Sequence, residues 1–429
     1  MGGAAVCVDR YRDGVQLDLD FVRANFPAFD RPVNAGQSFF ENAGGSFACR
    51  QTIDALTEYY TDFKVQPYSE FESSRRAGEL MDRSRRRWAE ALGVEAREVV
   101  FGPSTSANTY VLAHAFADVL EPGNEVIVTN QDHEANTGAI RRAADRVGCA
   151  LREWRIDPDT GLLDLADLEA LLNDRTGLVT VPHASNIVGA ENDVTRIAQL
   201  VHSVGARVIV DGVSFAPHTI PDVGSIGADV YLFSLYKTYS VHQGLMVVRS
   251  GLMAELPNQG HFFNDPIADK RLNPAGPDHA QVAAAGAVLE YVEASHRHHG
   301  GSGSDDLRTA SSAVSARWRA HEDSLTPTLL DVLAVRDDVR LIGPATLATV
   351  PGHRCPTIAF SPLAKDPQAV AHELVRRGVQ TSSGHYYAAR VLDALGLDPD
   401  RGVVRLSFVH YTSRADVDRA AQALVEALG

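Results

Sequence analysis

The sequence predicts an α/β fold with a mostly parallel central sheet, helices on both faces of that sheet and a smaller α+β domain at the C-terminal end. From about Gln37 to Gly251, helical periodicity alternates with short apolar runs rich in Val and Ile. Such runs are typical of strands buried on both faces of a parallel sheet. A chain of 429 residues exceeds what one hydrophobic core supports. Two domains are therefore expected.

Six of the apolar runs are the expected strands of the large sheet. Between them, helical periodicity predicts helices over residues 107–119 and 194–204, the second of which ends at Gly205, as expected for a helix C-cap. The predicted strands are residues 99–101, 125–128, 178–181, 207–210, 230–233 and 245–248.

The same pattern divides the chain into parts. Residues 1–36 form an N-terminal segment, residues 37–295 the large domain and residues 307–429 the small domain. A long helix over residues 280–294 precedes the stretch 296–306. The histidines of this stretch could bind a metal, but its polar, glycine-rich composition favours a flexible connection. The small domain should contain strands at 339–342, 357–360 and 403–408, a helix at 367–377 and a closing helix from Arg414.

Charge and composition argue against several classes of protein. The formal net charge of -15 disfavours a nucleic-acid surface, and the arginine-rich run 83–87 is typical of one solvated helix face. The first residues lack a signal-peptide pattern, and no apolar run reaches membrane-spanning length. The four cysteines stand singly, without the spacing of a metal site or redox motif. We expect a cytoplasmic protein with no metal, nucleic-acid or membrane partner.

Lys237 is the most informative residue. It is one of four lysines among the 40 lysines and arginines, and it closely follows the strand pattern at 230–233. Asp211 ends another apolar run, so it should lie at the carboxyl edge of the sheet, where open α/β folds bind ligands. In pyridoxal 5'-phosphate (PLP) enzymes a lysine forms the Schiff base and an upstream carboxylate holds the pyridinium nitrogen. The pair predicts a PLP site in the large domain.

The stretch 101–108 predicts a phosphate-binding loop. It runs from a strand through small hydroxyl residues into a helix, which places Thr105 and Ser106 near the free N–H groups of a helix N-terminus. Ser234, at the end of the strand before Lys237, would supply a further contact. The loop lacks a Gly-Lys-Ser sequence, so a nucleoside triphosphatase is not expected.

Two further residues match the needs of the cofactor and the substrate. His133 follows the strand pattern at 125–128, so its imidazole could stack on the cofactor ring and titrate near neutral pH. Arg405 interrupts the apolar strand pattern at 403–408 and needs an anion to be tolerated there. That anion would be a substrate carboxylate or an internal Asp or Glu.

With these residues in place, the chain resembles the class V aminotransferases of PLP fold type I, and within them it is most similar to the cysteine desulfurases. The resemblance runs from about Phe39 to the C-terminus and implies a homodimer with active sites at the subunit interface. The segments that carry it are 40–46, 101–108, 132–136, 183–189, 210–212, 233–237 and 383–385.

The resemblance also implies roles for single residues. Lys237 would form the Schiff base, Asp211 would pair with the pyridine nitrogen and His133 would stack on the ring. The remaining cofactor contacts would come from Thr105, Ser106, Asn186, Ser214 and Ser234, and the substrate contacts from Arg405, Asn42 and His385.

The chain departs from the desulfurase pattern at several positions. Desulfurases of this group carry a nucleophilic cysteine in a loop that corresponds to residues 382–387, and here Tyr387 takes its place. Val213 and Ser214 replace the usual Gln or Ser-Gln beside the aspartate. Tyr236 replaces a common His before the lysine, and Pro277 replaces a threonine that often reaches the partner's phosphate. These changes argue against persulfide transfer.

The residues therefore favour a PLP-dependent lyase that acts on a small L-amino acid by C–S cleavage or another β- or γ-elimination, through a quinonoid intermediate. Lys237 would take the α-proton, and Tyr387, Tyr386 or Tyr236 would protonate the leaving group. An aminotransferase, an epimerase or a decarboxylating enzyme would use the same scaffold. A non-catalytic PLP-fold sensor is a further alternative, which the retained lysine, aspartate, histidine and arginine disfavour.

Overall fold

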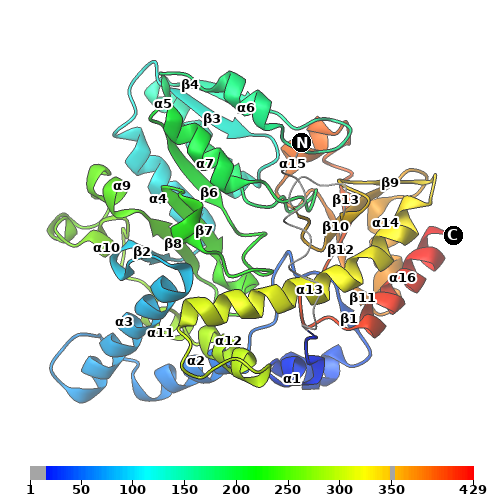
Figure 1. Cartoon of the computed structure of the whole chain (residues 1–429), viewed down its shortest axis with the longest axis horizontal. Helices are drawn as coiled ribbons and strands as arrows, with labels where there is room; N and C mark the ends of the chain where they lie inside the picture. Colours follow the sequence, from blue (N-terminus) through cyan, green and yellow to red (C-terminus); the bar gives the residue numbers. More distant parts are fainter. Residues whose placement is uncertain (1–15, 348–352) are drawn as a thin grey trace, which may run out of the picture.

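The large domain is built on one seven-stranded sheet with the order β2-β8-β7-β6-β5-β3-β4 (Figure 1). The computed structural model describes residues 16–347 and 353–429. Strands β7, β6, β5, β3 and β4 are parallel to one another, and β8 runs antiparallel to β7 and β2. The strands are β2 (Val99–Gly102), β3 (Glu125–Thr129), β4 (Ala150–Trp154), β5 (Thr176–Pro182), β6 (Arg207–Asp211), β7 (Val230–Ser234) and β8 (Gly244–Val248). The mostly parallel sheet is confirmed.

All six predicted strands are present, and β4 is an additional strand that the sequence did not indicate. It pairs with β3 alone, at the edge of the sheet. Its first three residues, 150–152, are exposed. These exposed residues interrupt the continuous apolar run on which the other predictions rested, whereas the opposite edge strand, β2, is buried along its whole length.

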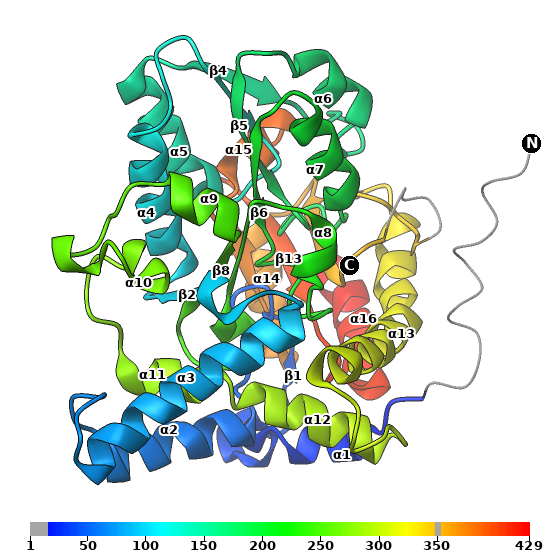
Figure 2. The same cartoon turned by 60° about the vertical axis from the view of Figure 1, so that its left-hand side comes forward.

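Helices cover both faces of the sheet, because successive side chains along a strand point to opposite sides. Val126 and Val128 pack in one core with helices α4 (Thr105–Ala117) and α5 (Glu134–Val147). Ile127 packs in the other core, with α3 (Glu72–Leu92) and α7 (Val194–Ser203). Figure 2 shows α4 and α5 on one side of the sheet and α6, α7 and α8 on the other.

The helix predicted over residues 280–294 is two helices, α11 (His279–Ala285) and α12 (Val288–His298). Gly286 separates them and lies against α3, where an added Cβ would be 2.8 Å from the Cα of Ser84. Helix α12 also extends three residues into the connection expected at 296–306. That connection is held by hydrogen bonds, since the buried His296 bonds through Nε2 to Asp305 at 2.7 Å.

The small domain contains a four-stranded antiparallel sheet in the order β12-β13-β10-β9, and α13 (Leu307–Ala334) connects it to the large domain (Figure 1). Its strands are β9 (Val339–Leu341), β10 (Thr357–Pro362), β12 (Ser382–Gly384) and β13 (Val403–Ser407), and its helices are α14 (Pro367–Arg376), α15 (Ala389–Ala394) and α16 (Arg414–Leu428).

Residues on both sides of the expected boundary at residue 37 contact the small domain. Strand β1 (Ser38–Phe39) pairs with β11 (Val379–Gln380) of the small domain, and the side chain of Phe40 packs in the small-domain core. The N-terminal segment also contacts this domain, because the Arg23 guanidinium of α1 (Leu19–Ala24) donates to the carbonyl of Tyr411 at 2.9 Å. The remaining helices are α2 (Arg50–Asp62), α6 (Leu165–Leu171), α8 (Val223–Ile226), α9 (Ser250–Glu255) and α10 (Ala268–Arg271).

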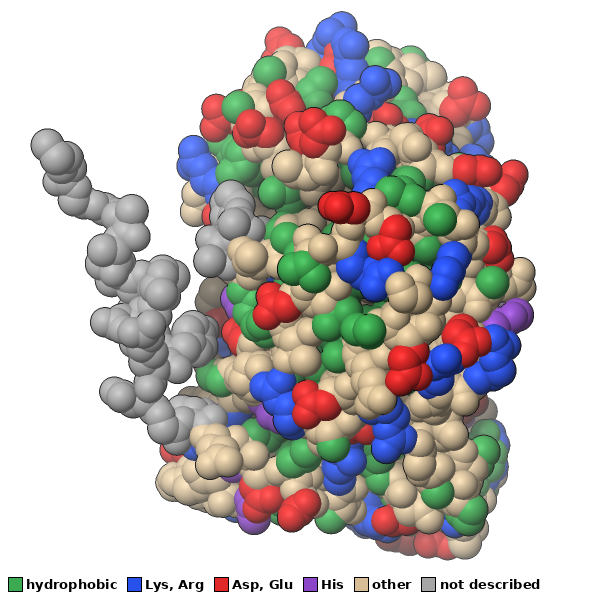
Figure 3. Space-filling model, turned by 90° about the vertical axis from the view of Figure 1, so that its right-hand side faces the viewer, with side chains coloured by type: hydrophobic (Ala, Val, Ile, Leu, Met, Phe, Trp, Pro, Cys, Tyr) green, Lys and Arg blue, Asp and Glu red, His purple; other side chains and the backbone are tan. Residues whose placement is uncertain are grey.

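Acidic and basic side chains are interspersed on the face drawn in Figure 3. Within residues 16–347 and 353–429, no helix is long and apolar enough to cross a bilayer. No group of His, Cys, Asp or Glu able to hold a metal ion is found in the same part of the chain.

Candidate active site

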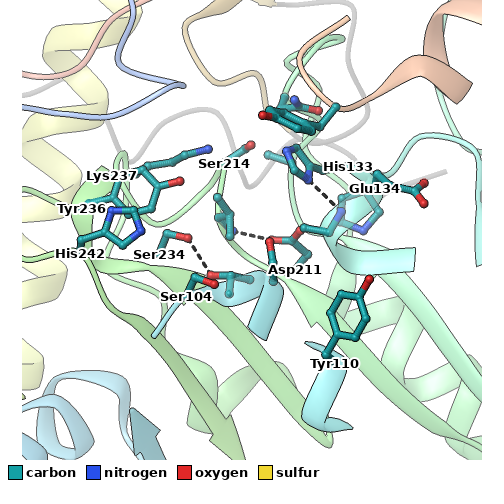
Figure 4. Close-up of a pocket in the computed structure, with 18 of the residues that line it drawn as sticks. Ser104, Tyr110, His133, Glu134, Asp211, Ser214, Ser234, Tyr236, Lys237 and His242 are labelled. Atoms are coloured by element: carbon teal, nitrogen blue, oxygen red, sulfur yellow. Dashed lines mark hydrogen bonds between the residues drawn. The ribbon is translucent and has the colours of Figure 1, made fainter. Parts of the chain in front are cut away.

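The predicted site residues meet at the carboxyl edge of the parallel strands. Strand β6 ends at Asp211, and β7 ends at Ser234, from which a 3-10 turn (Leu235–Lys237) leads to the lysine. The loop after β3 carries His133 to the same edge. Figure 4 shows Lys237, Asp211 and His133 around one cavity. Open α/β sheets bind ligands at this edge because the strand-to-helix loops open there.

The cavity has a volume of about 500 Å³ and contains every residue that we expected to contact the cofactor. Side chains that the sequence did not single out, such as Ser104 and His242, also line it. The lining from the predicted set is Thr105, Ser106, His133, Asn186, Asp211, Ser214, Ser234, Lys237 and Tyr387.

One end of the cavity is the N-terminus of α4. Ser104 is the N-cap, and its hydroxyl accepts a hydrogen bond from the N–H of Ala107. The Thr105 hydroxyl lies 2.7 Å from that of Ser234. Gly244 on β8 permits this approach, because an added Cβ would lie 2.5 Å from the Thr105 nitrogen. Hydroxyls and free N–H groups at a helix N-terminus form a site suited to a phosphate.

Lys237 lies inside the cavity with 7% of its surface exposed. The pKa of its ammonium is lowered to about 8, mainly by burial and also by the charge of Arg405, while Asp211 and Glu41 oppose the shift. A substantial fraction of this amine is therefore neutral near pH 8 and available as a nucleophile or base.

Asp211 is a buried carboxylate whose Oδ1 accepts a hydrogen bond from the N–H of Val213 at 2.8 Å. Burial raises its pKa to about 6, although that N–H and the charge of Lys237 oppose the shift. A cation placed beside it would favour the ionised form. This is the environment that a protonated pyridine nitrogen needs from a carboxylate.

His133 is the N-cap of α5, and its Nδ1 accepts a hydrogen bond from the N–H of Ala135 at 3.0 Å. Burial lowers its pKa to about 3, and the positive charges of Lys237 and Arg405 act in the same direction. The expectation that this imidazole titrates near neutral pH is therefore wrong. The ring is neutral, and the hydrogen bond at Nδ1 assigns its proton to Nε2.

Arg405 has an internal carboxylate as its partner, which is the second of the two alternatives left open by the sequence. Its Nη2 donates to Glu41 at 2.9 Å and its Nη1 to the carbonyl of Asn186 at 3.2 Å. The ring of Tyr386 covers the guanidinium, with Cζ 3.8 Å from the ring centroid. Sequence reasoning missed Glu41, a charged residue two positions after the end of β1.

The loop after β12 brings Tyr386 and Tyr387 to the cavity in an unusual backbone conformation. Their φ angles are 49° and 58°, in the left-handed region that non-glycine residues seldom occupy. Two hydrogen bonds hold the loop: Asn186 Nδ2 donates to the carbonyl of Tyr386 at 3.0 Å, and the N–H of Glu134 donates to that of Tyr387 at 2.7 Å. The Tyr387 ring consequently lies 5.3 Å from that of His133.

The two other substrate residues implied by the resemblance have different positions. His385 is exposed on the rim of an adjoining cavity. Asn42 lines neither this cavity nor the first one, because its amide is buried and donates to the carbonyl of Ser407 at 3.1 Å while accepting from the Tyr411 hydroxyl. The structure therefore does not bring the Asn42 side chain together with the other predicted site residues.

The residues present fit PLP. The α4 N-terminus with Thr105 and Ser234 would bind its phosphate. The buried Lys237 amine would react with its aldehyde, and Asp211 would pair with its ring nitrogen. The Oδ1 atom of Asn186 is buried and has no hydrogen-bond partner among the residues that the structure describes. An orphaned acceptor in such a cavity is expected where a ligand completes the site.

The sequence matches the Aminotransferase class-V family over residues 38–298 and 305–420. The chain belongs to this class V aminotransferase family. Aminotransferase-like protein FGM3 of Gibberella zeae is 31% identical over 425 residues, which cover 95% of this chain and 98% of that protein. A probable cysteine desulfurase of Mycolicibacterium paratuberculosis is 29% identical over 98% of this chain, which spans 60% of the relative's length.

Solved structures show the same fold. The cysteine desulfurase CsdA from Escherichia coli superimposes with a TM-score of 0.80 over 96% of this chain and 98% of that one, at 23% identity. Class V aminotransferases depend on PLP, and the chain therefore has the PLP fold type I and its cofactor.

Proposed function

We propose that this class V aminotransferase is a lyase that eliminates a group from the side chain of a small L-amino acid, without forming a persulfide on the protein. The observation that carries the proposal is the position of Tyr387. It stands at the loop position of the desulfurase cysteine, it is 69% exposed, and its ring lies beside His133 at the mouth of the cavity.

The cysteines support this proposal. Cys49, Cys149 and Cys355 are buried, and none of them lines either cavity around Lys237. Burial raises the pKa of each of these thiols, so that none is a ready thiolate. Cys7 lies outside the described residues.

The side chains divide the work of an elimination between them. The bound PLP supplies an electron sink for the pair released at the α-carbon. The Nζ atom of Lys237 is the base that takes the α-proton, since its lowered pKa leaves it partly neutral near pH 8. Asp211 would supply the negative charge that a protonated ring nitrogen needs, and the neutral His133 would lie beside the cofactor without adding charge.

Protonation of the leaving group falls to a tyrosine. The Tyr386 hydroxyl is already engaged with the carbonyl of Ser382 at 2.6 Å. Tyr236 stacks on His242 with ring centroids 4.6 Å apart. Among the described residues, none hydrogen-bonds the hydroxyl of Tyr387, which leaves that group available to a ligand at the cavity mouth.

Transamination is the second candidate, because the relative from Gibberella zeae is described as aminotransferase-like. Both reactions use Lys237 as the base. Transamination leaves the cofactor in its amine form until an oxo acid arrives, whereas elimination returns it unchanged. Epimerase, decarboxylating and non-catalytic functions have no particular observation in their favour.

The test is a screen of amino acids and of their α-amides with the holoenzyme in D₂O. Exchange of the α-proton, followed by NMR, reports the proton transfer, and mass spectrometry identifies the products. The proposal predicts exchange together with release of ammonia and an oxo acid, or of an unsaturated amino acid, while the absorbance of bound PLP returns to its starting value. Stoichiometric conversion of the cofactor to its amine form would instead establish the transaminase.

We also propose a cytoplasmic homodimer. Phe262 is 87% exposed and Phe263 is 61% exposed on one short turn, which is an unusual place for two large aromatic side chains on a monomer. Light scattering at micromolar concentration should give twice the mass of the chain. Replacement of both side chains by serine should then lower that mass.

A further inference from the structure

Arg405 is closed off from ligands by its own neighbours. Its Nη2 donates to Glu41, its Nη1 donates to the carbonyl of Asn186, and the Tyr386 ring covers one face of the guanidinium. Only 2% of the Arg405 surface is exposed, and its Nε atom is buried. A substrate carboxylate cannot form a bidentate hydrogen-bonded pair with Nη1 and Nη2 of Arg405 while Glu41 remains in place.

The group that faces the adjoining cavity is the anion of this pair. The cavity has a volume of about 560 Å³, and 26% of the Glu41 side chain is exposed, against 2% of that of Arg405. Its lining joins the pair to the reactive amine: Glu41, Ala43, Gly44, His133, Asn186, Tyr236, Lys237, residues 382–387 and Arg405. A ligand bound at Lys237 therefore meets a carboxylate at this end.

Glu41 is fixed in this position by several contacts. Its Oε2 accepts a hydrogen bond from the Ser382 hydroxyl at 2.8 Å, while its Oε1 binds Arg405. Its backbone pairs with that of Ser407 in an isolated bridge. Gly44 leaves room for the carboxylate, since an added Cβ would lie 2.9 Å from Oε1. The ion pair is therefore held in a fixed position in the lining of the pocket and is not a surface contact.

We infer that Glu41 is a specificity-determining residue that neutralises Arg405 and selects amino compounds whose α-carboxyl group is uncharged, such as an amide or an ester. A free α-carboxylate at this end lies beside Glu41 and is repelled, whereas an amide N–H donates a hydrogen bond to it. The inference deepens the proposed function by narrowing its substrate from a small L-amino acid to a derivative of one whose α-carboxyl group is uncharged, and it rests on the amine chemistry of that function.

The test compares L-alanine with L-alaninamide, neither of which carries a leaving group. The half-saturating concentration of each is measured from the absorbance change of bound PLP in the holoenzyme. The two amines differ in basicity, so their half-saturating concentrations are not compared directly. The informative quantity is the ratio of the half-saturating concentration of the acid to that of the amide, compared between Glu41→Gln and the parent. Because the substitution removes the competing charge from Arg405, we expect this ratio to fall about 10-fold or more, with the value for the amide nearly unchanged.

Ser382→Ala should lower the ratio in the same direction by a smaller factor, because it loosens Glu41 without removing it; it serves if Glu41→Gln folds poorly. Glu134→Gln is the matched control, since Glu134 lines the first cavity and does not contact Arg405; its ratio should equal that of the parent. The inference is overturned if Glu41→Gln leaves the ratio unchanged or raises it, or if neither amine perturbs the cofactor. Elimination is not measured here, so failure of the lyase proposal would leave this result intact.

Discussion

The Oγ1 atom of Thr105 and the Oγ atom of Ser234 lie 2.7 Å apart, although 129 residues separate them in the sequence. Thr105 begins α4 and Ser234 ends β7, and Gly244 on β8 admits the helix terminus to the sheet edge. The contact therefore unites three elements at one end of the cavity. Both hydroxyls can rotate toward an anion placed above the helix N-terminus.

Thr105→Val should weaken PLP binding. The substitution keeps the shape of the side chain and removes one hydroxyl that faces the phosphate, and a hydrogen bond to a charged group contributes about 1.5–3 kcal/mol, which corresponds to an approximately 10- to 100-fold higher dissociation constant. Equilibrium dialysis or an absorbance titration of the apoprotein measures it. Thr109→Val is the control, because Thr109 lies one turn further along α4 and donates to the carbonyl of Thr105 outside the cavity. Equal effects of both changes would contradict the role of Thr105.

The lowered pKa of Lys237 predicts the pH dependence of cofactor attachment. Only the neutral amine attacks the PLP aldehyde, so the rate of reconstitution of the apoprotein should rise with pH and reach half its maximum near pH 8, the value to which burial lowers this pKa. A free lysine side chain continues to gain rate up to about pH 10.4. His133→Asn should leave the midpoint in place, because that imidazole is already neutral throughout this range. A midpoint above about pH 9.5 would disprove the assignment.

The raised pKa of Asp211 predicts a pH-dependent cost in the apoprotein. Its pKa is about 6 in the fold against 3.8 ordinarily, so the folded state holds this proton more tightly. The stabilisation of the folded state by this proton is present below about pH 4 and is lost as pH rises through about 6. The free energy of unfolding changes by about 3 kcal/mol at most. Asp211→Asn has no proton to lose at this position, so its stability should not fall in this pH range.

The melting temperature of the Asp211→Asn apoprotein should consequently exceed that of the parent at pH 8 and match it near pH 4. Addition of PLP should reverse the order at pH 8, since the ionised carboxylate then gains a cationic partner. A melting-temperature difference that does not change with pH would refute the assignment.

The strands of the large sheet were predictable from the sequence where an unbroken run of buried residues is apolar. Strands buried on both faces must be apolar throughout, so the five central strands and the fully buried edge strand β2 were recognisable, whereas the exposed edge strand β4 was not. Contacts between segments that are distant in the sequence leave no such signal. Pairing of β1 with β11 joins segments about 340 residues apart, and no local pattern records such a partner.

The site was predictable to the extent that each side chain lies at a strand end or a few residues beyond it. Asp211 ends β6, Lys237 and His133 follow the ends of β7 and β3 within four residues, and all three line one cavity as expected. Two positions outside this pattern were not foreseen. Glu41 became the partner of Arg405, and Asn42 turned to Tyr411, because these contacts depend on how the two domains pack.

Comparison of three tyrosines tests the last step of the proposed elimination. Tyr387→Phe should slow product release by about 100-fold or more while α-proton exchange persists, because a general acid contributes about 10²- to 10⁴-fold only when the leaving group departs. Tyr236→Phe should keep both rates close to those of the parent, since Tyr236 acts through its ring on His242. Tyr386→Phe keeps the ring over Arg405 and loses a hydroxyl that faces the Ser382 carbonyl, so any effect should fall on binding. If Tyr387→Phe slowed exchange and release equally, the tyrosine would position the substrate rather than protonate the leaving group, and the donor would have to be sought in the substrate or in solvent.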